Sequence, residues 1–368
     1  MQQKSYKLKN MLLLAALGSA LAGPAMAQSS LAVMGTVDAF AGSVRNSGDA
    51  GKTSVVNSGG MTTSWFGFKG TEDLGSGLKA EFALTGFFQA DTGASGRFGG
   101  DNLFSRDANV ALAGSFGKVQ LGRGLAPSFL PYILFNPFGD SFTFSPLVLQ
   151  SYVPTGPFGT RTWPQATASD SGWSNEIIYS TPNFNGLSAN IHYQLGEVAG
   201  DSGKKNIGAN LLYFHGPFAL TAFYFDAQVA NPNQPGAILD PTAAPVNYAS
   251  VDRQKAWMLG GSYDMKVVKL FATYQHSKDD STTAADMTDK TWSLGASAPL
   301  GAGAVLFDYA QTKRNGALVG ADLKRDTASI GYDYNLSKRT DLYAIYMSDK
   351  VSTADREGSF GLGIRHKF

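Results

Sequence analysis

Residues 187–195 read Leu-Ser-Ala-Asn-Ile-His-Tyr-Gln-Leu, and every second side chain is apolar. A helix would repeat its apolar positions every three or four residues, so this spacing predicts a strand with one apolar and one polar face. The same alternation recurs over residues 291–298, 327–334 and 359–368. The fold class indicated is therefore all-β.

The composition narrows the class of β protein. The 368 residues include 43 glycines and no cysteine, and 12% of them are aromatic but only 16% charged. Length alone suggests two soluble domains, but a glycine-rich, aromatic-rich chain without a long apolar run is typical of a membrane barrel. The absence of cysteine excludes disulfides and catalytic thiols.

The N-terminus is typical of a leader. Lys4, Lys7 and Lys9 precede a short apolar core, and Ala25-Met26-Ala27 supplies a small-residue cleavage site. We predict a removed secretory signal peptide over residues 1–27 and a single barrel domain over residues 28–368. The mature chain is then nearly neutral, which gives no electrostatic case for binding nucleic acid.

The connections between alternating segments come in two lengths. Seven short turns alternate with eight longer polar loops, which predicts sixteen antiparallel strands with both termini on the short-turn side. Segments of about 10 residues suit a tilted membrane span better than a sandwich strand of about 5 to 6. The short turns lie near residues 74–77, 114–117, 182–186, 215–217, 264–267, 299–303 and 335–339; the loops lie near 46–60, 91–102, 124–172, 197–205, 229–250, 276–289, 314–323 and 349–357.

The third long loop, from Gly124 to Gly172, differs from the others. It contains seven of the fifteen prolines and nine aromatic side chains, but only three charges. So many prolines argue against a regular strand or helix, and the aromatic content argues against a solvated linker. We therefore expect this loop to fold into the lumen and constrict it.

Strand parity is ambiguous in two places. Over residues 104–113 and 340–348 both faces carry apolar side chains. A subunit interface or a misplaced strand boundary would each produce this pattern, and the register there stays open.

Several motifs together resemble the general diffusion porins of the Gram-negative outer membrane. Residues 64–80 (SWFGFKGTEDLGSGLKA), 103–106 (LFSR) and 116–123 (FGKVQLGR) resemble that family's early strands. Residues 332–343 (YDYNLSKRTDLY) and 363–368 (GIRHKF) resemble its last turn and terminal strand. The resemblance implies a sixteen-stranded homotrimer embedded in outer-membrane lipid, whose third loop narrows each barrel. It also implies that the barrel-assembly machinery reads the terminal Phe368.

The same resemblance suggests which residues form the pore constriction. In the family, wall arginines face carboxylates on the third loop, and Arg106 matches one wall position while Asp140 matches the loop tip. The alternatives are an ion pair for Arg106 and a turn cap for Asp140.

Two other wall positions depart from the family. They carry Trp65 and Trp173 where arginine is usual, and the parity of Trp65 with Lys69 aims both into the lumen. Either tryptophan could instead be an interfacial or loop-packing residue. Arg123 and Arg161 could add positive charge, but the sequence does not place them. With these replacements we expect weak anion selectivity.

The predicted function is passive diffusion of small solutes and ions through a water-filled pore. One alternative is a channel biased toward aromatic or weakly charged molecules, with the two tryptophans as stacking surfaces. Another is a plugged structural or adhesive barrel.

Chemistry beyond transport has little support in the sequence. A barrel lipase would need a catalytic set, and His192 has no recognisable nucleophile near it, so we predict no enzyme activity. No histidine pair has metal-binding spacing, so no metal or cofactor is predicted. We assign Asp279, Asp280, Asp286 and Asp289 to an exposed loop, with calcium binding as the less favoured reading.

Overall fold

The computed structural model of the chain describes residues 29–97, 101–152, 171–197, 199–200, 203–229, 251–281 and 286–368. The predicted signal peptide at 1–27 and Arg161 lie outside these ranges. So does the second half of the third loop.

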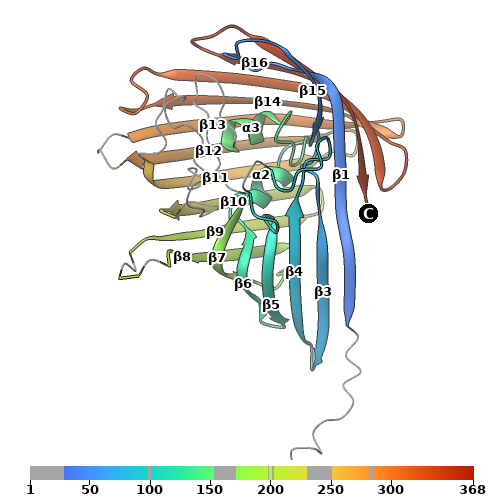
Figure 1. Cartoon of the computed structure of the whole chain (residues 1–368), viewed down its shortest axis with the longest axis vertical. Helices are drawn as coiled ribbons and strands as arrows, with labels where there is room; N and C mark the ends of the chain where they lie inside the picture. Colours follow the sequence, from blue (N-terminus) through green and yellow to red (C-terminus); the bar gives the residue numbers. More distant parts are fainter. Residues whose placement is uncertain are drawn as a thin grey trace, which may run out of the picture.

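The described residues form a closed antiparallel β-barrel (Figure 1). Successive strands pair in chain order, and β1 closes the ring by pairing with β17, which sets Thr36 opposite Lys367. Sixteen strands build the wall, as predicted, and the short β2 is an additional strand that pairs only with the end of β1. The strands are β1 (Ser30–Val44), β2 (Thr53–Ser58), β3 (Trp65–Gly75), β4 (Leu78–Phe87), β5 (Asp107–Gly114), β6 (Gly117–Leu125), β7 (Gly172–Ser180), β8 (Leu187–Leu195), β9 (Lys205–His215), β10 (Phe218–Ala227), β11 (Val251–Asp264), β12 (Lys269–Ser281), β13 (Asp286–Leu300), β14 (Gly303–Asn315), β15 (Leu323–Asn335), β16 (Thr340–Val351) and β17 (Glu357–Lys367).

The alternation of side chains gives the wall an apolar outer surface. Ile191 and Leu362 keep 52% and 53% of their surface exposed on the outside of the barrel. Polar neighbours such as Asn210 and Thr327 are buried on the inward face. An exposed apolar belt around a polar interior is the pattern of a barrel whose outside contacts lipid.

All seven predicted short turns lie between consecutive strands. The turn between β3 and β4 needs residues that tolerate a left-handed backbone, because Gly75, Ser76 and Gly77 all have positive φ. Two of these three positions are glycines, which reach that conformation without the penalty of a side chain.

A close approach of two backbones closes the barrel near the C-terminus. The backbone N–H of Phe368 donates to the Gly35 carbonyl (3.0 Å), and the Gly35 N–H donates back to Phe368 (3.1 Å). A Cβ on Gly35 would lie 2.5 Å from the Trp65 carbonyl oxygen and 2.7 Å from the Phe368 ring. Only glycine fits at this point of β1.

Aromatic side chains form a belt on the outer surface, several residues inside the strand ends. The rings of Trp257 and Tyr274 lie 5.6 Å apart, and those of Trp292 and Tyr309 lie 5.2 Å apart. None of the helices in the described ranges is long and apolar enough to span a membrane.

The prediction that residues 276–289 form a loop was wrong. Strand β12 continues to Ser281, and β13 begins at Asp286. Two of the acids that suggested a loop have partners on the adjacent strand. Asp279 accepts a hydrogen bond from Gln254 of β11 (2.5 Å), and Asp289 binds the buried Arg314 of β14. Polar residues can extend a strand when the neighbouring strand supplies their hydrogen bonds.

Candidate functional site

The third loop contains two short helices, contrary to the expectation that its prolines exclude regular structure. These are α2 (Phe129–Leu134) and α3 (Pro146–Tyr152). Pro131 and Pro146 both lie in the first turn of a helix, where the backbone N–H has no helical partner and proline is tolerated. The prolines therefore begin helices here.

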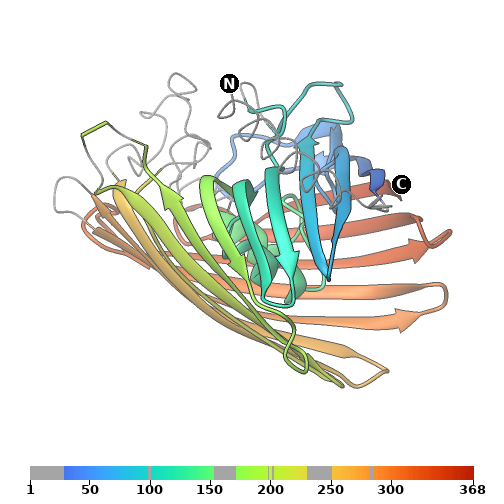
Figure 2. The same cartoon turned by 90° about the horizontal axis from the view of Figure 1, so that it is seen from below.

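The described half of this loop is fastened to the inward face of one side of the barrel. The Tyr132 hydroxyl donates to Gln275 on β12 (2.6 Å), and the Gln150 amide donates to Thr327 on β15 (2.8 Å). The Ser329 hydroxyl donates to the Phe144 carbonyl (2.6 Å). Figures 1 and 2 show α2 and α3 on the concave side of the sheet.

Apolar packing supports these hydrogen bonds. Phe138 and Phe144 are fully buried in a cluster that includes inward-facing residues of β16, and the Phe144 ring meets Phe40 of β1 edge to face at 5.3 Å. We call strands β10–β16 the loop-bound wall.

A second contact fixes the tip of the loop. Ser141 and Thr143 donate to the carbonyls of Gly60 (2.6 Å) and Gly59 (2.9 Å), which precede β3. This segment is held in turn by the buried Asp38 of β1, which accepts backbone hydrogen bonds from residues 60, 61 and 62 at 2.9 to 3.0 Å. The loop tip is therefore tied to the start of the barrel as well as to its far side.

Asp140 lies at this tip and is linked to Arg365 by hydrogen bonds through Thr62. Thr62 donates to Asp140 (3.0 Å) and accepts from the Arg365 guanidinium (3.0 Å). Arg365 also pairs with Asp341 (3.1 Å) and Asp333 (3.2 Å). Burial of its carboxyl raises the pKa of Asp140, while the Thr62 hydrogen bond and the charges of Arg365 and Arg106 oppose that rise.

Trp65 and Arg106 come together on the barrel wall. The Arg106 guanidinium lies 4.1 Å from the centre of the Trp65 ring, a cation–π geometry. Arg106 also pairs with its neighbour Asp107 (2.7 Å). The structure thus places the aromatic face of Trp65 next to Arg106, the arginine that matches a wall position of the porin family.

Arg123 and Trp173 lie away from this group. Arg123 is buried, and its guanidinium donates to the Ser105 carbonyl (2.6 Å) and the Ser174 hydroxyl (2.9 Å). Trp173 has no exposed surface and packs with Phe225, 6.0 Å between ring centres. In this structure Trp173 supports the wall and offers no face to a solute, which corrects the interpretation of Trp173 as a stacking surface.

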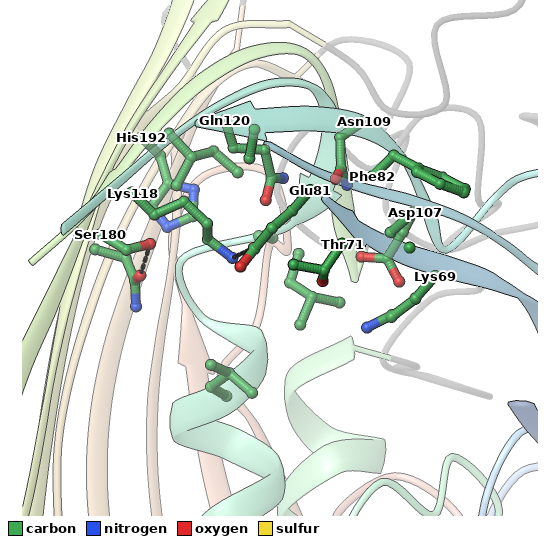
Figure 3. A pocket seen from close by; sticks show the side chains of 18 of the residues that line it. Lys69, Thr71, Glu81, Phe82, Asp107, Asn109, Lys118, Gln120, Ser180 and His192 are labelled. Carbon is green, nitrogen blue, oxygen red and sulfur yellow. Dashed lines mark hydrogen bonds and ion pairs between the residues drawn. The ribbon is translucent and has the colours of Figure 1, made fainter. Parts of the chain in front are cut away.

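Lys69 lines a cavity of about 360 Å³ on the turn side of the Trp65–Arg106 stack (Figure 3). The other side chains around it are mostly polar, and Lys118 contacts Glu81 across it (3.7 Å). All these residues come from β3–β9 and the adjoining loop, so we call β3–β9 the open wall. The labelled lining residues are Lys69, Thr71, Glu81, Phe82, Asp107, Asn109, Lys118, Gln120, Ser180 and His192.

A second cavity, of about 410 Å³, lies on the loop side of the same stack. Its lining includes Thr63, which precedes β3, and Phe87, which lies opposite Trp65, whereas the first cavity contains the pair Lys69 and Ala83 farther along β3 and β4. Trp65 lies between Thr63 and Lys69 in the chain. The Trp65–Arg106 stack adjoins both cavities, because Phe87 of the second cavity pairs with Trp65 and Asp107 of the first cavity binds Arg106.

Arg365 is the site residue that the sequence reasoning missed. The alternation over 359–368 already put it on the polar face of the terminal strand. The family resemblance gave no signal for Arg365, because it implies only an assembly role for this strand, through Phe368.

Comparison with known proteins agrees with this architecture. A family model described as Gram-negative porin matches residues 13–354. Outer membrane porin protein 32 of Delftia acidovorans is 32% identical over 98% of this chain and 99% of its own length. An outer membrane porin protein of Bordetella pertussis is 28% identical over 98% of this chain and its whole length. The solved anion-selective porin from Comamonas acidovorans superposes with a TM-score of 0.73 at 27% identity, covering 93% of this chain and 100% of that one.

Proposed function

Because the chain belongs to the Gram-negative porin family, we propose that its two cavities and the constriction between them form one water-filled path across the outer membrane. Small hydrophilic solutes and ions diffuse along this path passively. The observation that carries the proposal is the succession of cavity, Trp65–Arg106 stack and cavity along a single wall of the barrel.

The constriction is assigned to side chains that border this path. Arg106, Trp65 and Lys69 belong to the wall, and Asp140 belongs to the loop tip. We add Arg365, which reaches Asp140 through Thr62.

Two further residues, both buried in the wall, support the constriction without bordering the path. Arg123 contributes positive charge from a buried position, and Trp173 packs in a cluster shared by the loop and the wall. No residue is assigned a catalytic role, and the relatives are channel proteins.

Weak anion selectivity follows from how the charges are arranged. Arg106 has Asp107 beside it, and Arg365 has both Asp333 and Asp341. The two arginines of the constriction, Arg106 and Arg365, are thus largely compensated, unlike an unpaired arginine facing the lumen. The Comamonas acidovorans relative is described as anion-selective, so we expect this chain to keep the sign and lose much of the strength.

The outer surface suggests how subunits assemble. Strands β1, β3 and β17 present aliphatic and phenylalanine side chains, for example Leu31, Phe66 and Leu362, whereas tyrosine and tryptophan gather on the outside of β7–β16. Aromatic girdles mark lipid contact, so we propose that the aliphatic face forms a homotrimer and that lipid covers the rest.

Export and assembly complete the proposal. Residues 1–27 are removed as a signal peptide, and the barrel-assembly machinery recognises Phe368 at the end of the terminal strand. The Phe368 ring keeps 44% of its surface exposed.

Planar-bilayer recording with a salt gradient tests the function and the selectivity together. We expect stepwise ohmic conductance and a small reversal potential of the sign for anions, which Arg106→Gln shifts toward cations. The control is Lys338→Gln, which removes a positive charge from an exposed turn. Silence from inserted trimers would favour a plugged structural barrel, and a strongly anion-selective potential would refute the charge compensation.

A further inference from the structure

A row of lysines crosses the outer surface at the loop end of the barrel. Lys290, Lys313 and Lys324 are exposed on the adjacent strands β13, β14 and β15. The strand register places Lys290 directly opposite Lys313, and Lys313 directly opposite Lys324. Neighbouring strands are about 4.8 Å apart, and like charges placed directly opposite destabilise a sheet.

The row lies just beyond the aromatic belt. Lys290 is two residues from Trp292 on the same outward face, and the Trp292 ring packs against Tyr309. Two strand residues advance the chain by about 7 Å, and aromatic belts mark the boundary between hydrocarbon and headgroups. The three ammonium groups therefore stand at the depth of the lipid headgroups.

Carboxylates of the protein compensate only part of this charge. Asp326 contacts Lys324 (3.2 Å), but it also accepts hydrogen bonds from the Tyr309 hydroxyl (2.5 Å) and from Gln311. Within the described ranges, Lys290 and Lys313 form no ion pair. The row has more positive charge than its neighbours neutralise.

The positive charge continues toward β11. Lys255 lies directly opposite Lys278, and Lys278 contacts both Asp280 (3.1 Å) and Asp286 (3.3 Å). The nearest outward carboxylates on β12 and β13 are thus already bound to Lys278. They are not free to neutralise the adjacent row.

We propose that Lys290, Lys313 and Lys324 bind the phosphate groups of a membrane lipid in the leaflet at the loop end of the barrel. Phosphate carries the negative charge and the acceptor oxygens that three closely spaced ammonium groups require. The partner is a lipid because apolar side chains continue directly below the row, including Leu294 and Phe307, which are 52% and 44% exposed. Acyl chains cover this surface while the headgroup reaches the lysines.

The turn end of the barrel supplies a matched control. Lys79, Lys266 and Lys338 are also exposed, but each lies at a different turn and none faces another lysine across a strand pair. Replacing these three removes the same charge from the protein without affecting the row.

Native mass spectrometry of the purified, folded protein in neutral detergent tests the proposal, with diphosphoryl lipid A as the probe. We expect K290Q/K313Q/K324Q to bind this lipid at least about tenfold more weakly than the unsubstituted protein. The control K79Q/K266Q/K338Q should bind it normally, and K290R/K313R/K324R should retain binding because the charge is kept. Resistance of the barrel to heat in detergent reports that every variant is folded.

Four results would overturn the proposal. They are equal binding by the unsubstituted protein and K290Q/K313Q/K324Q, an equal loss in the control variant, loss of binding in the arginine variant, and equal binding of the same lipid without its phosphates. Inorganic phosphate is added as a competitor to distinguish the source of the phosphate. If it displaces lipid A as effectively as lipid A displaces itself, the row is a site for free phosphate and the lipid assignment fails.

Discussion

The loop-bound wall, β10–β16, and the open wall, β3–β9, have the same alternating strand pattern but different inward faces. Inward positions of the loop-bound wall carry apolar side chains such as Phe223, Met258 and Ile345, which are buried against the loop or its neighbours. Inward positions of the open wall carry Lys69 and Glu81, which line a cavity.

The difference shows that the polarity of an inward position follows what it contacts. A side chain that faces solvent space can keep its charge, whereas a side chain covered by the loop must be apolar or have a hydrogen-bond partner. Gln275 and Thr327 meet that condition on the loop-bound wall by bonding to Tyr132 and Gln150. Among the described residues, the lumen thus has one packed side and one side that borders a cavity.

The largest expected effect comes from disrupting the packing between the loop and the loop-bound wall. Phe144→Ala removes a fully buried ring from the loop and should lower the free energy of unfolding by about 3 to 5 kcal/mol. Because that ring lies between the loop and β1, we also expect larger and noisier single-channel conductance, measured in planar bilayers. Phe307→Ala is the matched control, since it removes the same ring from the lipid-facing surface. Unchanged conductance in Phe144→Ala would mean that the loop does not depend on this packing for its position.

A smaller effect, on ion selectivity, is expected from protonating Asp140, which lies between the loop-bound wall and the open wall. Asp140 has a raised pKa, so on lowering the pH it loses its negative charge before an ordinary aspartate does. Since Arg106 and Arg365 keep their charges, the constriction becomes more positive, and anion selectivity should rise with a midpoint above 3.8, the usual pKa of aspartate. Reversal potentials recorded as a function of pH would show this. The same rise in Asp140→Asn would assign the titration to another group.

The sequence accounts for the barrel because the signals involved are local. Alternation and turn residues act over a few positions, so all seven short turns were predicted. The two walls also explain the ambiguous parity at 340–348. Tyr343, Ile345 and Met347 point inward and pack with Phe144, so both faces of β16 are apolar. Neither a subunit interface nor a misplaced boundary is needed to explain that pattern.

The constriction was only partly predictable because it depends on contacts between distant segments. Arg365 reaches Asp140 through Thr62, three positions spread over most of the chain. The burial of Trp173 depends on Phe225, a partner on a distant strand of the wall. Similarly, the partners of Asp279 and Asp289 lie on neighbouring strands, so local polarity alone indicated a loop.

The central claim is that solutes pass along the open wall while the loop covers the other wall. The chain has no cysteine, so single cysteines can be introduced at Asn109 or Gln120 on the open wall and at Thr291 or Ser329 on the loop-bound wall. We predict that a charged, water-soluble thiol reagent modifies the first pair rapidly and reduces conductance in bilayer recordings. The second pair, each only 1% exposed, should stay unmodified in the folded protein. Equal modification of both pairs, with equal loss of conductance, would contradict the account.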